Sequence, residues 1–253
     1  MSKGERNRQK ARERIAQMRA LEAKRRRRRG WTTGVGVAML VVIAGVGITL
    51  AVIRGGGGAP KLKLAALSTL GTLRPAPSPG PAGPEGVPIT GAAPLAGVAA
   101  ATGGKVDGIS CQNSEQAVLH IHAHLTIFVN GSPRQIPAGI GIPGARVQNS
   151  AQGPFVADGT CFYWLHTHAA DGIIHIESPV QRTYTLGDFF DEWGQQLGPN
   201  GVGPAAGRVV AIYNGQRYVG NPRDIPLNAH AQIQLEVSTP LVAPQTITFP
   251  GSL

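Results

Sequence analysis

Residues 119–129, LHIHAHLTIFV, alternate between two kinds of side chain. Successive side chains of a β-strand point to opposite faces, so this segment predicts a strand with one wholly apolar face, which must lie in a core. That face carries Ile121, Ala123, Leu125, Ile127 and Val129. The other face carries His120, His122, His124, Thr126 and Phe128. Any fold of this chain must therefore place three histidines on the side of a sheet away from its core.

Two Asn-Gly pairs, Asn130-Gly131 and Asn214-Gly215, each interrupt an alternating segment. Asn-Gly is the favoured pair for a type I′ hairpin turn because both central residues need positive φ. Two hairpins are therefore expected. Further strands are expected within residues 161–168, 172–177 and 230–237.

One helix is expected over residues 186–193, where apolar residues recur at helical spacing. Thr185 and Asp188 fit a capping box at its start, and Gly194 fits its end. The predicted fold class is α+β, mostly antiparallel sheet with one short helix. A β-grasp-like layout is expected in the second half of the domain, and a β-sandwich is the alternative.

A second histidine cluster lies on an expected hairpin. His166 and His168 end its first strand, and His175 and Glu177 lie on its second. If the loop covers residues 169–172, His166 lies opposite His175. If the turn is the two-residue pair at 171–172, His168 faces His175 instead. Either register places the four side chains on one face, with cross-strand Cβ separations of about 5 Å.

Six histidines on three expected strands predict a metal site. Imidazole suits zinc and copper, and three protein ligands leave an open position on zinc. Asp171 and Glu177 are expected to accept hydrogen bonds from these ligands or to supply a fourth ligand. The clusters form either separate half-sites or one dinuclear centre, and His230 is expected to be a packed or capping residue. The predicted ligands are His120, His122, His124, His166, His168 and His175.

The positive charge of the chain is concentrated at its N-terminus. Residues 1–30 hold 13 Lys and Arg and 3 Asp and Glu, which accounts for the whole formal charge of +10. A nucleic-acid partner is not expected, because the remaining residues are balanced in charge. The tail is expected to be a topology signal, and binding to anionic lipid is the alternative.

Residues 31–53 contain no charged side chain. As a helix this stretch is about 35 Å long, which is enough to cross a bilayer core of about 30 Å. The basic tail before it places the N-terminus in the cytoplasm and the residues after Arg54 outside. A cleaved signal peptide is the alternative, but its apolar core is usually about 7–15 residues long. A single-pass transmembrane anchor is therefore predicted.

Residues 54–104 are rich in Gly, Ala and Pro and contain no aromatic residue. Such a composition has little to bury and predicts a disordered or partly extended linker. Residues 105–253 are long enough for one core and form the predicted extracytoplasmic domain. Cys111 and Cys161 are the only cysteines, and in an oxidising compartment they predict a disulfide. A metal site containing one of these cysteines is the alternative.

The strings HIHAHLTIFVNG, CFYWLHTH and GIIHIESP, followed by YTLGDFFDEWG, resemble a group of uncharacterised bacterial single-pass membrane-anchored proteins. The resemblance covers about residues 110–250 and implies a membrane anchor but no particular reaction. Three functions are therefore expected as alternatives. They are an extracytoplasmic domain that binds copper or zinc, a small membrane-tethered metalloenzyme, and an envelope interaction module without metal. The chain lacks GxSxG and Walker motifs, so the enzyme alternative has no motif of its own.

Overall fold

The computed structural model describes residues 62–98 and 103–253, which belong to one compact unit spanning Gly58–Leu253. The predicted transmembrane helix over residues 31–53 and the basic tail over residues 1–30 lie outside the described residues. Within the described ranges, no helix combines the length and apolar character needed to cross a membrane.

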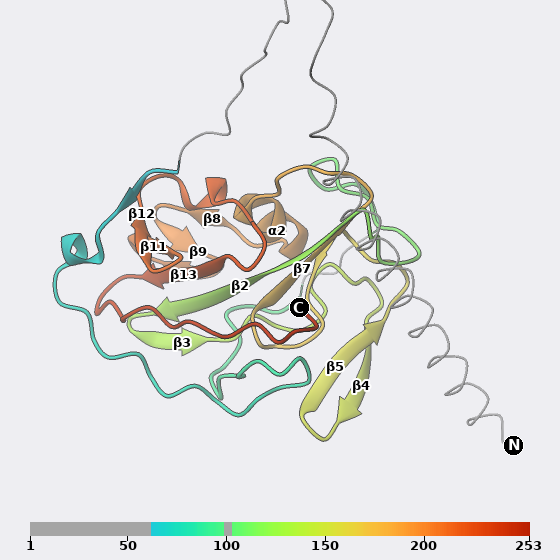
Figure 1. Cartoon of the computed structure of the whole chain (residues 1–253), viewed down its shortest axis with the longest axis horizontal. Helices are drawn as coiled ribbons and strands as arrows, with labels where there is room; N and C mark the ends of the chain where they lie inside the picture. Colours follow the sequence, from blue (N-terminus) through green and yellow to red (C-terminus); the bar gives the residue numbers. More distant parts are fainter. Residues whose placement is uncertain (1–61, 99–102) are drawn as a thin grey trace, which may run out of the picture. The chain divides into compact units, whose positions relative to one another are not determined.

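An eight-stranded sheet forms the centre of the domain (Figure 1). Its spatial order is β1 (Leu64–Ala65), β12 (Gln216–Tyr218), β11 (Val209–Tyr213), β13 (Gln232–Val237), β2 (Leu119–Val129), β7 (Ile173–Ser178) and β6 (Leu165–His166), and β3 (Ser132–Arg134) also pairs with β2. β2 and β13 run parallel, and the other neighbouring strands run antiparallel. With one short α-helix among the described residues, the α+β prediction is confirmed.

Both predicted Asn-Gly turns close hairpins. Asn130 and Gly131, between β2 and β3, have φ values of 52° and 73°. Asn214 and Gly215, between β11 and β12, have φ values of 48° and 76°. Positive φ at both central residues is the requirement of a type I′ turn, so the local sequence determines these two hairpins.

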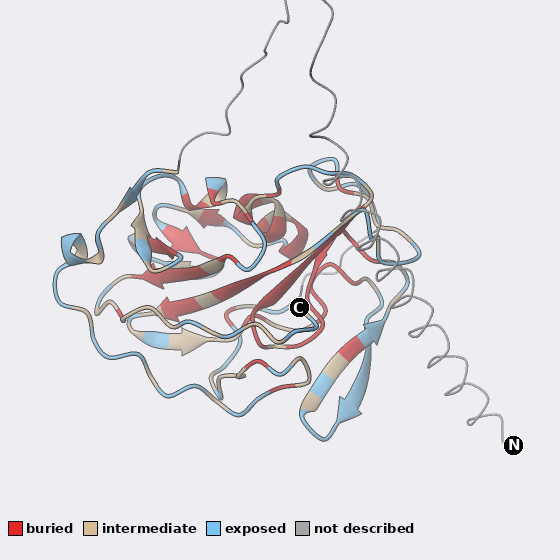
Figure 2. Ribbon diagram, in the orientation of Figure 1, coloured by how far each residue is buried: buried red, intermediate tan, exposed pale blue. Residues whose placement is uncertain are grey.

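Helix α2 (Leu186–Trp193) begins and ends where the sequence predicts. The Thr185 hydroxyl accepts from the Asp188 backbone N–H, the Asp188 carboxylate accepts from the Thr185 N–H, and Gly194 ends the helix in the left-handed conformation. Figure 2 shows that the helix and the central strands are largely buried. Its apolar side chains share a core with the apolar face of β2: Leu186, Phe189, Phe190 and Trp193 with Ala123, Leu125 and Ile127. The predicted facing of β2 is thereby confirmed.

The remaining elements are short. A three-stranded sheet contains β8 (Leu197–Gly198), β9 (Gly201–Val202) and β10 (Ala205–Ala206), and a separate hairpin contains β4 (Arg146–Ser150) and β5 (Gly153–Asp158). Two 3₁₀ turns, η1 (Leu67–Leu70) and η2 (Pro222–Asp224), complete the list. The β4–β5 hairpin stands apart from the main sheet in Figure 1.

The two cysteines form the predicted disulfide. Cys111 and Cys161 are bonded, and the adjacent residues Gln112 and Phe162 exchange backbone hydrogen bonds. Both sulfur atoms are therefore used, which excludes the alternative of a cysteine-containing metal site.

Residues 62–98 are not a tether free of the domain, so the linker prediction is wrong for this stretch. β1 pairs with β12, and Val87 and Leu95 are buried. The Leu95 backbone N–H donates to the carbonyl oxygen of Gln135 at 2.9 Å. The physical reason is that a few aliphatic side chains suffice to fix a stretch that prolines and glycines already hold in turns. The folded unit therefore begins well before residue 105.

Candidate metal centre

The sheet register brings the two histidine clusters together. His122 pairs with His175 and His120 with Glu177 across β2 and β7, and His166 pairs with His175 across β6 and β7. This is the register expected for the longer of the two possible loops. The alternative register, with a two-residue turn, is wrong.

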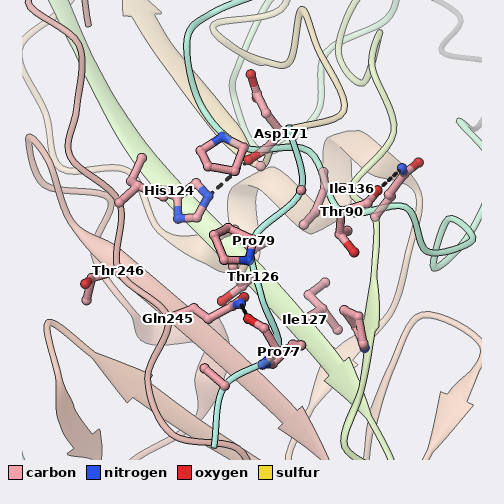
Figure 3. Close-up of a pocket in the computed structure, with 18 of the residues that line it drawn as sticks. Pro77, Pro79, Thr90, His124, Thr126, Ile127, Ile136, Asp171, Gln245 and Thr246 are labelled. Carbon is pink, nitrogen blue, oxygen red and sulfur yellow. Dashed lines mark hydrogen bonds between the residues drawn. The ribbon is translucent and has the colours of Figure 1, made fainter. Parts of the chain in front are cut away.

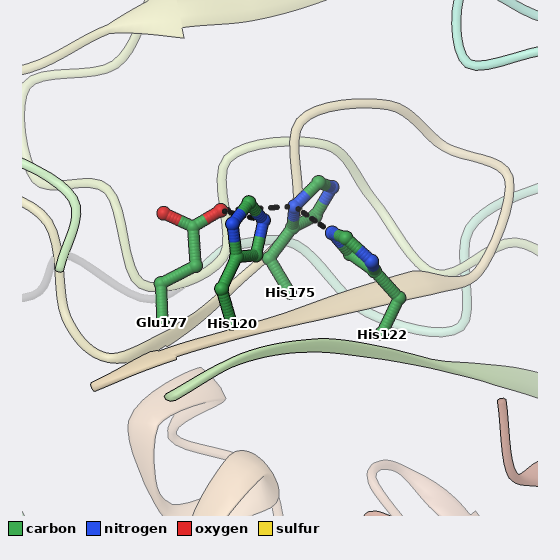
Figure 4. Close-up of side chains that lie close together, drawn as sticks. All are labelled: His120, His122, His175 and Glu177. Atoms are coloured by element: carbon green, nitrogen blue, oxygen red, sulfur yellow. Dashed lines mark hydrogen bonds and ion pairs between the residues drawn. The ribbon is translucent and has the colours of Figure 1, made fainter. Parts of the chain in front are cut away.

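The first group combines β2 and β7. The possible ligand atoms of His120, His122, His175 and Glu177 all lie within 4.8 Å of one another. Figure 4 shows the three imidazoles and the carboxylate converging above the two strands. His122 Nε2 lies 3.1 Å from His175 Nδ1, and Glu177 Oε1 lies 3.2 Å from His120 Nε2. Three nitrogens and one oxygen thus have the spacing of a metal-ligand set.

The second group contains His166, His168 and His175, again within 4.8 Å. His166 Nδ1 lies 2.8 Å from the carbonyl oxygen of Tyr163, and His168 Nδ1 lies 2.5 Å from that of Val156. A carbonyl only accepts, so each Nδ1 carries the proton and donates it. The two Nε2 atoms, 3.2 Å apart, are therefore the free nitrogens, and in neutral rings their lone pairs face each other.

His175 belongs to both groups, so the two clusters meet in space. A third group within the same distance contains Glu115, His166 and Glu177. Glu115 Oε1 also lies 3.4 Å from His168 Nε2. The sequence left open whether the clusters converge, and in the structure they form one continuous set of ligand atoms.

Two carboxylates hold a proton on His175. Its Nε2 lies 2.7 Å from Glu85 Oε1, and its Nδ1 lies 3.4 Å from Glu177 Oε1. Burial disfavours the charged ring, but the hydrogen bonds to Glu177 and Glu85 outweigh burial and raise the pKa of His175 to about 9. The metal-free site therefore has an imidazolium at its centre.

The neighbouring groups respond to that charge. Burial and the charge of His175 lower the pKa of His122 to about 3, and burial and the same charge hold the pKa of His166 well below its usual range. Burial opposes ionisation of Glu177, yet hydrogen bonds from His120 and His175 hold its pKa well below the ordinary value. Neutral imidazoles and an ionised carboxylate are the forms that bind metal ions.

His124 is not part of the cluster, which corrects one predicted ligand. Its Nε2–H donates to the carbonyl oxygen of Asp171 at 3.0 Å, and burial lowers its pKa to about 4. The reason is its position along β2. His124 pairs with Ile173, the first residue of β7, so no histidine lies opposite it.

The two predicted supporting carboxylates have different positions. Glu177 contacts His120 and His175 directly, as a fourth ligand would. Asp171 contacts none of the clustered imidazoles at hydrogen-bond distance; its Oδ1 accepts from the Ile173 N–H. Burial and the neighbouring charge of Glu85 raise the pKa of Asp171 to about 7.

Glu85 and Glu115 belong to the site although the sequence analysis did not predict them. Glu85 is the only acidic residue between Glu22 and Asp107, and it follows a proline and precedes a glycine. An isolated acidic residue within a Pro-Glu-Gly turn is the sequence signal that could have identified Glu85. Glu115 lies four residues after Cys111, so the disulfide fixes the segment that carries it.

His230, the isolated histidine, has the packing role expected from the sequence. Its ring stacks on Phe249, and its Nε2 lies 3.1 Å from the carbonyl oxygen of Leu253.

A cavity of about 640 Å³ lies on the same face of the sheet, next to the histidines. Figure 3 shows His124 beside Asp171 toward one end, and Gln245 hydrogen-bonded to the carbonyl oxygen of Pro77 toward the other. Its volume is within the range of small-molecule pockets. β2 therefore contributes to the metal-ligand cluster and, one residue pair further along, to this cavity.

No protein family, curated protein or solved structure matches this chain. The resemblance to bacterial membrane-anchored proteins stays a prediction from the histidine strings. The function must be argued from the geometry of the site.

Proposed function

We propose that this domain binds a transition-metal ion, copper or zinc, through its clustered histidines. The supporting observation is that two groups of possible ligands share His175 and hold their ligand atoms within 4.8 Å of one another. The Nε2 atoms of His166 and His168 are 3.2 Å apart while both Nδ1 atoms donate to carbonyls, so a proton or a metal ion must lie between the two Nε2 atoms to avoid repulsion of their lone pairs. A metal ion in this position satisfies both nitrogens at once.

The proposed ligands are the five clustered histidines and one carboxylate: His120, His122, His166, His168, His175 and Glu177. Imidazole suits both zinc and copper, and no cysteine sulfur is free to favour one of them. Six ligands exceed the four of a tetrahedral zinc ion. One ion in one group and two ions that divide these ligands between them are therefore both compatible with the ligand set.

We further propose that residues 31–53 anchor the protein in a membrane, with the domain on the extracytoplasmic side. The uncharged stretch and the basic tail before it support this placement, and the Cys111–Cys161 disulfide fits an oxidising compartment. The basic tail fits contact with anionic lipid, and no nucleic-acid or protein partner is proposed.

The test is the metal content of the purified full-length protein, measured by elemental analysis before and after incubation with copper or zinc. Wild-type protein is expected to retain about one or two ions per chain. The double variant His166→Ala/His175→Ala is expected to lose them, because it removes the shared residue and a member of the second group. His230→Ala is the matched control, since this histidine lies outside the cluster.

A folded, disulfide-bonded wild-type protein that retains no copper or zinc would contradict the proposal. The envelope interaction module would then be the better interpretation, with the histidines serving hydrogen bonding alone.

A metalloenzyme is the second candidate, because one edge of the cluster is open. The side chains of His120 and Glu115 are 44% and 45% exposed, whereas the other clustered side chains are buried. An open edge gives a substrate access to a bound ion. Turnover that requires the metal and disappears with His166→Ala would favour this candidate over simple binding.

For the fold, we propose the β-grasp-like layout over the β-sandwich. The central order β3–β2–β13–β11, with β2 parallel to β13 and helix α2 between the two hairpins in the chain, supports this assignment.

A further inference from the structure

Residues 76–90, called the strap below, bring a carboxylate to the metal centre from a part of the chain remote in sequence. The Glu85 side chain is 6% exposed, and its Oε1 lies 2.7 Å from His175 Nε2. Glu85 and His175 are ninety residues apart. The contact therefore links the strap directly to the residue that both ligand groups share.

The local sequence of the strap explains how Glu85 reaches this position. The Gly86 N–H donates to the carbonyl oxygen of Gly83, which closes a four-residue turn with Pro84 at its second position. Gly86 has a φ of 78°, a conformation that glycine adopts without strain. Val87, which follows, is fully buried. A rigid turn and a buried anchor thus hold Glu85 at the tip of the strap.

The contact determines which nitrogen of His175 is available to a metal ion. A carboxylate accepts hydrogen bonds, so Glu85 keeps a proton on Nε2 and leaves Nδ1 for the ion. Nδ1 is the atom that faces His122 Nε2, at 3.1 Å, and Glu177 Oε1, at 3.4 Å. Without Glu85, the ring would be free to hold its proton on either nitrogen.

The other oxygen of Glu85 is less well satisfied. Its Oε2 is buried and has no hydrogen-bond partner among the described residues, and the acidic side chain of Asp171 is close by. A buried carboxylate in such surroundings is favourable only while positive charge is held nearby. The His175 imidazolium supplies part of that charge in the metal-free protein, and a divalent ion that replaces its Nδ1 proton increases the charge further.

We infer that Glu85 is a positioning residue for the metal centre and that the strap and the bound ion stabilise each other in place. The inference rests on the proposed metal-binding function. Linkage is reciprocal, so an ion that binds more tightly when the strap is docked also holds the strap more firmly against the sheet. The stretch that the sequence presents as a linker is then part of the site.

The test uses the full-length protein and Zn²⁺ or Cu²⁺, whichever the wild type retains. Affinity is measured by competition with a chromophoric chelator for wild type, Glu85→Ala, Glu85→Gln and Asp224→Asn. Loss of a residue that orients a metal ligand typically weakens binding about 10–100-fold, and Glu85→Ala is expected to fall in that range. Glu85→Gln is expected to lie in between, because its amide oxygen still accepts the Nε2 proton. Asp224→Asn removes an exposed carboxylate outside the cluster and is expected to change nothing.

A second readout separates positioning from a general loss of structure. Hydrogen exchange of residues 76–90 is expected to slow when the ion is added to wild type, and to stay unchanged when it is added to Glu85→Ala. Unchanged affinity in a folded Glu85→Ala protein would overturn the inference while leaving metal binding intact. So would an ion that binds wild type without affecting exchange in the strap. A wild-type protein that binds no ion is a different result, since it removes the proposed function and with it this inference.

Discussion

At the scale of single residues, the carboxyl group of Glu192 is buried in surroundings that disfavour its negative charge. It lies on the buried side of α2, and neither side-chain oxygen has a hydrogen-bond partner among the described residues. Burial, together with the charge of Asp188, raises the pKa of Glu192 well above its ordinary value. The folded protein therefore holds a proton on this carboxyl up to a higher pH than the unfolded chain does.

This difference predicts a pH-dependent effect of Glu192→Gln. When a carboxyl group has a higher pKa in the folded state than in the unfolded state, the protein loses stability as the pH rises through and above the unfolded value of about 4.5. The glutamine variant avoids that loss. It is expected to match wild type near pH 4 and to be the more stable of the two proteins at pH 8. Urea unfolding at both pH values measures the effect, and Asp224→Asn serves as an exposed control. Equal stabilities at pH 8 would contradict the assignment.

The histidines of β2 show which features of a structure an alternating residue pattern can predict. Alternation along β2 predicts correctly that His120, His122 and His124 share the face away from the core. It does not predict their neighbours, because these depend on where β7 begins. His124 lies opposite the start of β7 and so faces a backbone carbonyl instead of an imidazole. Periodicity determines the face of a side chain, while strand ends determine its partners.

At the scale of elements, segments with strong local signals were predictable and the segment without them was not. Helix α2 and both Asn-Gly hairpins follow from caps and turns within a few residues. Residues 62–98 are held in position by contacts with strands far away in sequence, such as the pairing of β1 with β12. Composition alone indicated that this stretch had too little to bury, and Glu85 was missed for the same reason.

Leu95 tests whether this stretch belongs to the fold. Its side chain is 7% exposed and lies in the main core, so Leu95→Ala is expected to destabilise the protein by about 2–5 kcal/mol. Leu64, in β1, is 37% exposed, and Leu64→Ala is expected to cost clearly less. Chemical unfolding of the full-length protein, with the disulfide intact, compares the two. Two equally small effects would mean that the stretch is not part of the folded core.

At the scale of the whole molecule, the main sheet separates two environments. One face of the sheet packs against α2 in the apolar core, and the opposite face carries the clustered histidines of β2 and β7. The apolar side chains of the core and the two sulfur atoms of the Cys111–Cys161 disulfide are separate from the candidate ligands. We therefore expect folding to depend on metal less than it does in small zinc domains.

A strong chelator is accordingly expected to remove bound metal without unfolding the domain. Far-ultraviolet circular dichroism is expected to stay unchanged after chelation, and re-addition of the ion is expected to restore the original metal content. The chelated His166→Ala/His175→Ala variant is the control for effects of the chelator itself. Loss of the dichroism signal on chelation of wild type would show that the ion is structural.

The backbone carbonyls of Tyr163 and Val156 orient the rings of His166 and His168 before any ion arrives. An ion that binds between these rings freezes little conformational freedom, because the side chains have already lost it on folding. The same rigidity prevents the ligands from rearranging to suit each ion. Divalent ions would then be distinguished by how well their preferred coordination fits a fixed arrangement of nitrogens, and less by the general order of their affinities.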